Sequence, residues 1–266
     1  MPQLKEKEYA VCEKADGVRM LALWTRTPTE RISVLMDRSG KVTPFTMKGV
    51  LPKFYEGTLL DVEVLSDNRI LVFDGARVCG IPCNSLNLWD RQDLIGKWVS
   101  KVLKVKNDPY RIIHKKHVPL SNPAELLKKK LDYGIDGLIF TPVQTPLQMG
   151  TQRDMFKWKP KHLITIDFKV EQGTAKNTWK LYLQEKGELV HKESLKSVHS
   201  LLVPGTIIEF KQDKKGKWVP TRPRPDKTLP NSVFTYHRTL VNIQEDIGDH
   251  ELLGLEGPLK ITYLQH

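Results

Sequence analysis

Short stretches in which apolar and polar residues alternate recur in this sequence and limit the folds open to it. In residues 164–170, Ile, Phe and Val occupy every second position, with Thr, Asp and Lys between them. Residues 58–65 and 179–183 repeat the same period of two. Because successive side chains of a β-strand point to opposite faces, this period predicts strands rather than helices. The chain is therefore expected to be built largely from antiparallel β-sheets.

The alternation divides the chain into two predicted domains with a boundary near His162. Residues 1–162 combine strands with two helices, the first over residues 90–106, where apolar residues recur at helical spacing. The second helix is predicted over residues 122–134, with Asn122 as its cap, Pro123 at its first position and Gly134 as its stop. Residues 163–266 contain short strands, which favour a small β-barrel with a C-terminal helical extension. The expected fold class is α+β.

The net charge indicates the kind of binding partner, and the number of cysteines indicates the cellular compartment. The 266 residues carry a formal net charge of +11, which favours a polyanionic partner such as nucleic acid or nucleotide phosphates; a basic surface that serves only solubility is the alternative. The three cysteines do not make a disulfide framework and suit a reducing, intracellular compartment. Cys79 and Cys83 have no second ligand pair at metal spacing, so structural zinc is not expected. No apolar run reaches the length of a membrane span.

The first candidate for chemistry is Lys14, in the segment Lys-Ala-Asp-Gly-Val-Arg that ends at Arg19. Gly17 permits a tight turn, so Lys14 is expected at the end of an apolar strand with its amine directed into a cleft. A lysine amine is nucleophilic only after it loses its proton, and Arg19 is a nearby cation that favours this loss and can hold a phosphate. Lys-Asp-Gly turns are also common on protein surfaces, and these residues alone leave that alternative open.

Two further segments gather charge at strand spacing. Asp61 and Glu63 alternate with apolar residues, so they either face solvent or line a cleft. Lys157 and Lys159 are expected on the same side of an extended segment. Two like charges held side by side repel unless an anion lies between them, which indicates an anion site.

A last charged segment lies between prolines. Prolines at positions 223 and 225 keep the chain extended, so Arg222 and Arg224 are expected to project from one side. Two forked guanidinium groups at rigid spacing suit phosphate binding. An exposed basic linker is the alternative.

Together, six segments in this order resemble the motif set of the covalent nucleotidyltransferases, the superfamily of ATP-dependent DNA and RNA ligases and mRNA-capping guanylyltransferases. Three details resemble the capping branch: an Asp-Gly at 136–137 where ligases more often have Glu-Gly, Pro160 after Lys159, and a continuation of the last motif into Pro230 and Asn231. The six segments are KADGVR at 14–19, LDVE at 60–63, VFD at 72–74, DGLIF at 136–140, FKWKP at 156–160 and RPRPDK at 222–227.

The resemblance implies a nucleotidyltransferase domain of the ligase and capping type, ATP-grasp-like and built from antiparallel sheets, followed by an OB-fold β-barrel. It also implies a two-step reaction with GTP as substrate and Mg²⁺ or Mn²⁺ as cofactor. Lys14 would attack the α-phosphate of GTP, release pyrophosphate and carry GMP on its amine. The GMP would then pass to the 5′-diphosphate end of an RNA to form the cap.

The same resemblance assigns roles to individual residues. Glu63 would contact the ribose or the metal, Phe73 would stack on the base, and Asp136 would hold the metal and the surroundings of the lysine. The implied catalytic residues are Lys14, Arg222, Asp226 and Lys227, the last three orienting pyrophosphate. The implied nucleotide-binding residues are Arg19 at the sugar or RNA end, Glu63, Phe73, Lys115 or Lys116 at the guanine, Asp136, Lys157 and Lys159 at the α-phosphate, and Arg224 as a support.

Two other functions are alternatives to capping for a chain with these motifs. A polynucleotide ligase would use ATP and carry AMP on Lys14, and a catalytically inactive relative would only bind RNA. A capping activity would lead us to expect an RNA triphosphatase, a methyltransferase or an RNA polymerase as partner, and no membrane. The expected location is the nucleus or a cytoplasmic site of viral transcription.

Overall fold

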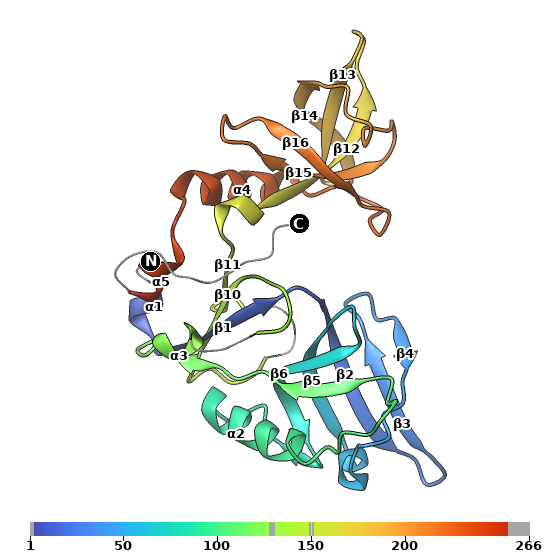
Figure 1. Cartoon of the computed structure of the whole chain (residues 1–266), viewed down its shortest axis with the longest axis vertical. Coiled ribbons are helices and arrows are strands. Elements are labelled where there is room, and N and C mark those ends of the chain that lie inside the picture. The colour runs from blue at the N-terminus through green and yellow to red at the C-terminus, as the bar shows by residue number, and fades with distance from the viewer. Residues whose placement is uncertain (1–2, 128–130, 149, 151, 255–266) are drawn as a thin grey trace. The chain divides into compact units, whose positions relative to one another are not determined.

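The computed structural model describes residues 3–127, 131–148, 150 and 152–254, and the chain divides into two compact units between Trp158 and Lys159 (Figure 1). None of the described helices is long and apolar enough to span a membrane. The predicted domain boundary near His162 stays a prediction.

The larger sheet of the first unit has seven strands and is antiparallel apart from one pair. Its order is β4-β3-β2-β5-β6-β7, and β8 pairs with β6 in parallel. Trp24 and Phe54 are fully buried in the core that this sheet forms with α2, where their rings meet edge to face. The strands are β2 (Val18–Arg26), β3 (Arg31–Met36), β4 (Val42–Pro44), β5 (Thr58–Val64), β6 (Arg69–Val78), β7 (Ile81–Pro82) and β8 (Arg111–His114), with the short 3₁₀ helix η1 (Pro52–Glu56) between β4 and β5.

The smaller sheet of the first unit has four antiparallel strands in the order β11-β10-β1-β9. The central strands β1 and β10 are buried along almost their whole length, as expected for strands covered on both faces. Its strands are β1 (Tyr9–Ala15), β9 (Val118–Pro119), β10 (Ile135–Pro142) and β11 (Phe156–Trp158), and the short helices α1 (Gln3–Glu6) and α3 (Ala124–Leu127) belong to the same unit.

Both predicted helices of this unit extend less far than their sequence patterns indicated. Helix α2 (Leu88–Val99) begins at the cap Asn87 and ends before residue 100, whereas the prediction ran to 106. The chain turns away there, and the Leu103 backbone N–H donates to the Gly49 carbonyl instead of continuing the helix. The second prediction, 122–134, is wrong for residues 131–134, which lead into β10, while residues 128–130 lie outside the described part.

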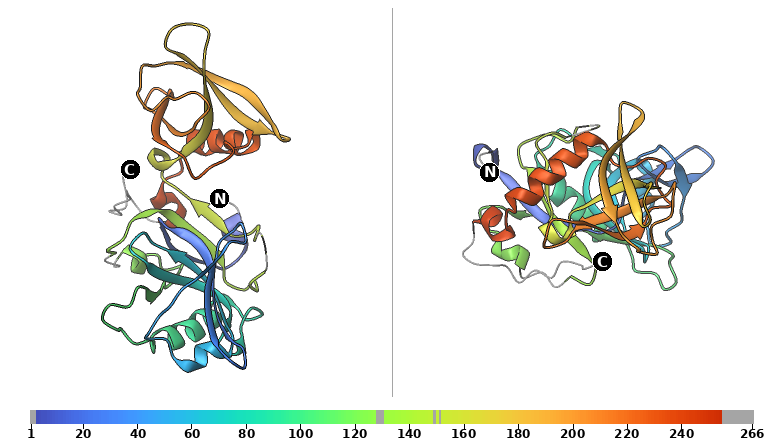
Figure 2. Two further views of the ribbon diagram at one scale, coloured as in Figure 1. Left: turned by 90° about the vertical axis from the view of Figure 1, so that its right-hand side faces the viewer. Right: turned by 90° about the horizontal axis from the view of Figure 1, so that it is seen from above.

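The second unit is a five-stranded antiparallel sheet in the order β14-β13-β12-β15-β16, followed by two helices. Phe168 lies at the centre of its core, with Phe210, Trp218 and Tyr236 packed around it edge to face. Helix α4 packs beside this sheet and contacts β12 and β13 (Figure 2). The elements are η2 (Lys161–Leu163), β12 (Thr165–Gln172), β13 (Thr178–Glu185), β14 (Glu188–Lys196), β15 (Ile207–Gln212), β16 (Trp218–Pro223), α4 (Val233–Glu245) and α5 (Asp249–Leu253).

Strand β14 was absent from the sequence prediction. Its residues are mostly exposed, so apolar alternation is weak there. Its place at the edge of the sheet, paired only with β13 among the described strands, explains why few of its side chains need to be apolar. Closure of this sheet into a barrel stays a prediction.

A buried ion pair joins α2 to β6 in the first unit. The guanidinium of Arg91 is fully buried and donates through Nε and Nη2 to the two Asp74 oxygens, at 2.8 and 3.0 Å. Its Nη1 donates to the Leu86 carbonyl at 2.6 Å. One side chain therefore fixes the helix, its leading loop and the middle of β6 in a single arrangement.

Replacing Arg91 by leucine should lower the free energy of unfolding by about 3–5 kcal/mol, because it leaves the buried Asp74 carboxylate without its partner. Urea unfolding followed by tryptophan fluorescence measures this loss. Lys97→Leu, on the exposed side of the same helix, is the matched control and should change the value by no more than about 0.5 kcal/mol. An Arg91→Leu loss as small as the control's would contradict this account of α2.

Candidate active site

Lys14 lies near the end of β1, opposite Gly137 of β10. Its amine donates to Asp136 Oδ1 at 2.7 Å, and the Asp136 carboxylate is almost fully buried whereas Lys14 is partly exposed. The neighbouring Glu13 points to the other face, where it accepts a hydrogen bond from the Tyr133 hydroxyl at 2.7 Å. Because successive side chains of β1 point to opposite faces, the buried carboxylate of Glu13 is separated from the Lys14 amine, which Asp136 holds and which stays accessible.

Gly17 lies in the two-residue bend that joins β1 to β2, as predicted, but a left-handed backbone is not the reason for glycine there. Its φ is not in the positive range, so a left-handed turn is not what requires glycine. A Cβ at this position would lie 2.7 Å from the Val64 carbonyl oxygen and 2.9 Å from Cγ of Glu63. The Gly17 backbone N–H also acts to lower the pKa of the Glu63 carboxyl, against the larger effect of burial. Glycine is needed here because the backbone passes directly against β5.

Arg19, on β2, forms a two-pronged contact with Asp61 on the adjacent strand β5. Its Nε and Nη2 donate to the two carboxylate oxygens at 2.8 and 2.5 Å, and Asp61 is buried. These hydrogen bonds raise the pKa of the Arg19 guanidinium. Asp61 is therefore not on a solvated strand face, so the solvent-exposed alternative is wrong for this residue, while its place in a cleft stays a prediction.

Phe73 is the extra residue of a β-bulge between β5 and β6. Asp61 pairs with Asp74 and Val62 with Val72, which leaves Phe73 without an opposite residue and turns its half-buried ring out of the regular pleat. The Gln92 side-chain amide donates to the Phe73 carbonyl at 2.6 Å. Sequence reasoning missed Gln92, because nothing in a helical pattern distinguishes it from an ordinary surface residue.

Two cations lie against the Phe73 ring. The Arg19 guanidinium carbon is 5.7 Å from the ring centroid, and the Lys115 amine is 5.9 Å from it. Lys115 is buried, and its backbone N–H donates to the Val72 carbonyl at 2.8 Å. Of the two lysines that the sequence left open, Lys115 is the one that contacts Phe73, while Lys116 is exposed.

Glu63, on β5 of the larger sheet, interacts with the charges of Lys14 and Lys157 on the smaller sheet. Burial raises the pKa of its carboxyl, and the positive charges of Lys115, Lys14 and Lys157 act against that rise. Lys157 lies on β11, opposite Ile139 of β10. Its pKa is lowered because its amine is partly desolvated and is repelled by Arg19 and other cations.

The structure thus brings together most of the predicted residues of the first unit around Glu63. One further cation, Arg38, follows β3 and acts on Lys157; the sequence analysis had not singled it out. The gathered residues are Lys14, Arg19, Glu63, Phe73, Lys115, Asp136 and Lys157.

The other predicted residues belong to the second unit. Strand β11 ends at Trp158, one residue before Lys159, so Lys159 lies outside the strand that carries Lys157. Arg222 lies opposite Glu209 and donates to it through Nε at 2.9 Å, while about half of its side chain stays exposed. Arg224 also donates to Glu209, at 3.2 Å, which confirms that both arginines project to one side.

Arg224 is held by three carboxylates. Its Nη1 donates to Asp167 at 3.0 and 3.1 Å, and its Nε and Nη2 donate to Asp226 at 3.1 and 3.0 Å. The hydrogen bonds to Asp226 raise the pKa of Arg224 and lower the pKa of the Asp226 carboxyl to about 2. Lys227 is exposed, and its backbone N–H donates to the Arg224 carbonyl. Arg224 therefore fixes the loop that follows β16.

No group of three or more His, Cys, Asp and Glu side chains suited to a metal gathers among the described residues. Cys79 and Cys83 are buried, and burial raises the pKa of each to about 11, which keeps them as thiols near neutral pH.

Replacing Arg224 by glutamine should raise the pKa of Asp226 from about 2 towards its ordinary value of 3.8, because the two hydrogen bonds that stabilise the carboxylate are lost. Since Asp226 is more acidic in the folded state, it contributes stability above pH 3.8 that disappears as the pH falls through about 2. Carboxyl chemical shifts recorded during an acid titration measure the change. Arg238→Gln, on α4, is the control, and an Asp226 pKa equal in the two variants would refute the contact.

Comparison with known proteins gives matches over almost the whole chain. The protein-family model of the mRNA capping enzyme catalytic domain matches residues 1–161. The family model of the mRNA capping enzyme C-terminal domain matches residues 134–253. The chain is 30% identical to the mRNA-capping enzyme subunit alpha of Schizosaccharomyces pombe over 94% of its own length and 75% of the relative. It is 25% identical to the subunit alpha of Neurospora crassa, over 99% of the chain and 83% of the relative.

Solved structures give only a distant likeness. A mycobacterial DNA ligase D, solved with ATP and MES, is 14% identical with a TM-score of 0.47, over 83% of this chain and 90% of that one. The family matches, in contrast, confirm the resemblance to capping enzymes and the combination of a nucleotidyltransferase domain with a C-terminal OB domain. The chain belongs to the mRNA capping enzyme family and is a nucleotidyltransferase of the guanylyltransferase kind.

Proposed function

We propose that this chain forms a covalent intermediate with GMP on Lys14 and passes the GMP to the 5′-diphosphate end of an RNA. The observation that carries this proposal is the Lys14 amine, which is held at 2.7 Å from Asp136 and whose charge acts on Glu63 together with the charges of Lys115 and Lys157. Phosphoryl transfer depends on positioned positive charge more than on acid–base groups, and this site concentrates such charge.

In the first step, Lys14 Nζ forms a bond with the α-phosphorus of GTP, and the bond from that phosphorus to the bridging oxygen of the β-phosphate breaks. Pyrophosphate leaves with the electron pair. The amine must give up a proton, and Asp136 Oδ1 accepts its hydrogen bond in the structure. In the second step, an oxygen of the terminal RNA phosphate attacks the same phosphorus, and the phosphorus–nitrogen bond breaks to return the lysine.

The geometry of the first unit supports the roles of its other residues. Phe73 presents a ring with cations near it, and we assign it to stacking on the guanine, with Lys115 as the residue that contacts the base. Arg19, held by Asp61, is assigned to the sugar or the RNA end. Lys157 is assigned to the α-phosphate, because an anion would relieve the repulsion between its amine and the neighbouring cations Arg19 and Lys14.

Glu63 and Asp136 are the residues that would hold Mg²⁺ or Mn²⁺. Their carboxylate oxygens are the ligands that Mg²⁺ prefers, and Mg²⁺ commonly takes one or two carboxylates together with substrate phosphates. Both carboxylates interact with Lys14, so they suit a metal beside the reacting lysine. Such an ion supplies neutralisation of the phosphate charge.

In the second unit, Arg222, Asp226 and Lys227 are assigned to the leaving pyrophosphate. Arg222 has half of its side chain exposed and one carboxylate partner, whereas Arg224 is occupied by three carboxylates. Arg224 is therefore the support that places the others. We also propose that Lys159 contacts the α-phosphate and that the five-stranded sheet closes into an OB-type barrel.

Lys14→Ala should abolish attachment of GMP, because no other group replaces the amine that forms the bond. Incubation with radiolabelled GTP or ATP and Mg²⁺, followed by denaturing electrophoresis, measures attachment. Lys41→Ala, an exposed lysine on the same unit, is the control and should label normally with GTP. Labelling by ATP alone would turn the assignment to a ligase, and retained labelling of folded Lys14→Ala would remove Lys14 from the mechanism.

Arg222→Ala should slow attachment of GMP by about tenfold or more and leave transfer from preformed enzyme–GMP nearly unchanged, since pyrophosphate takes part only in the first step. Single-turnover rates of the two steps, measured separately, provide the comparison. Arg238→Ala, which removes the same charge from α4, should affect neither step. Equal losses in both steps for Arg222→Ala would refute the assignment.

A further inference from the structure

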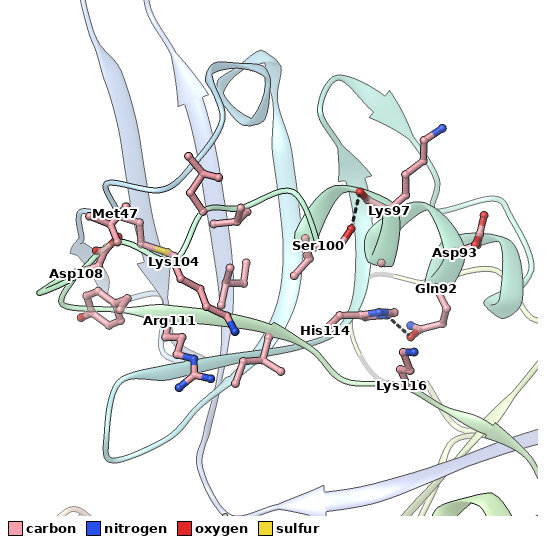
Figure 3. A pocket seen from close by; sticks show the side chains of 18 of the residues that line it. Met47, Gln92, Asp93, Lys97, Ser100, Lys104, Asp108, Arg111, His114 and Lys116 are labelled. Carbon is pink, nitrogen blue, oxygen red and sulfur yellow. Dashed lines mark hydrogen bonds between the residues drawn. The ribbon is translucent and has the colours of Figure 1, made fainter. Parts of the chain in front are cut away.

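The first unit has a large groove on the α2 side of its seven-stranded sheet, outside the set of residues assigned above. Helix α2, the loop over residues 100–110 and β8 form its walls, and its volume is about 990 Å³ (Figure 3). This is the size of a cavity that holds a substantial ligand. The proposed reaction with GTP does not use it.

The rim of this groove is basic. Lys104 extends from the loop, Arg111 begins β8 and Lys116 follows β8, and all three are exposed (Figure 3). Of the acidic lining residues, Asp108 uses Oδ2 to accept the backbone N–H groups of Lys48 and Gly49, at 2.8 and 3.3 Å. The lining carries four cations, Lys97, Lys104, Arg111 and Lys116, against the two carboxylates Asp93 and Asp108, and this excess of positive charge favours an anionic occupant.

The interior of the groove carries rings and apolar side chains. Tyr110 and His114 line it, together with aliphatic residues such as Val102 and Ile112. A binding surface with cations along its edge and rings inside it is the arrangement that holds single-stranded nucleic acid, in which phosphates meet the cations and bases stack. A site for a small free anion would not need this length of apolar surface.

The groove shares a wall with the nucleotide site. Gln92 and His114 both line it, and their side chains are joined at 2.9 Å (Figure 3). The same Gln92 side chain donates to the carbonyl of Phe73. Consecutive residues after β8 divide between the two sites, since Lys115 contacts the Phe73 ring and Lys116 lines the groove.

We propose that this groove binds the single-stranded RNA that follows the 5′ end undergoing capping. The inference rests on the function proposed above, because the polyanion that must reach the nucleotide site in the second step is an RNA. An acidic protein segment would also meet the rim charge, but the rings inside the groove and the shared wall favour RNA.

The test is a double variant, Lys104→Ala with Arg111→Ala, against a charge-matched control, Arg26→Ala with Lys41→Ala, whose residues are exposed and do not line the groove. Fluorescence anisotropy with a single-stranded RNA of roughly 20 nucleotides measures binding, from about 50 to 200 mM salt. The groove variant should bind about tenfold more weakly. Its plot of log affinity against log salt should be shallower by about 1.4, for two phosphate contacts at about 0.7 each.

Transfer from preformed enzyme–GMP supplies a second measurement. With a long 5′-diphosphate RNA the groove variant should show a KM raised by about tenfold, whereas an RNA of roughly three nucleotides should react as in the parent protein. GMP attachment from GTP should be unchanged in the groove variant. If the parent protein forms no GMP adduct, the proposed function fails. The anisotropy measurement then still shows whether the groove binds RNA.

Two results would overturn the proposal. RNA binding by the groove variant equal to that of the control would exclude the groove as an RNA site. Loss of binding to a fluorescent polyglutamate peptide, with RNA binding unchanged, would assign the groove to an acidic protein segment instead.

Discussion

Several of the cations assigned to the nucleotide site or its support have to be held beside others of the same sign, and buried carboxylates make this possible. Arg19 is held by Asp61, and Lys14 by Asp136. Without these partners, the cations around Glu63 would repel one another and turn towards solvent. The carboxylates fix the directions of the Lys14 and Arg19 side chains, so that a phosphate can be bound without rearrangement at the moment of reaction.

The same principle extends to the framework. Arg91 and Gln92, adjacent on α2, each hold one residue of the segment that contains Phe73: Arg91 binds the side chain of Asp74, and Gln92 binds the carbonyl of Phe73 itself. The bulge that turns the Phe73 ring outward is thereby supported from behind by a helix. In the second unit, Arg224 supports the loop that carries Asp226 by donating two hydrogen bonds to the Asp226 carboxylate.

The sequence predicts much of this, and its failures have physical causes. Period-two alternation located β5, β12 and β13, and local spacing placed Lys14 near the end of β1, because both depend on neighbours in the chain. The partners that orient the cations could not be found in this way, since Asp61 meets Arg19 across 42 residues and Glu209 meets Arg222 through strand pairing. The end of α2 was misplaced for the same reason: Gly49, distant in sequence, takes the hydrogen bond of Leu103.

The central claim is that Lys14, among several lysines close to one another, is the residue that carries GMP. The most direct test is to incubate the protein with GTP and Mg²⁺, digest it and determine by mass spectrometry which peptide has gained GMP. The account predicts GMP on Lys14 alone, removed when pyrophosphate is added before digestion. GMP on Lys115 or Lys157, or no GMP on folded protein, would contradict it.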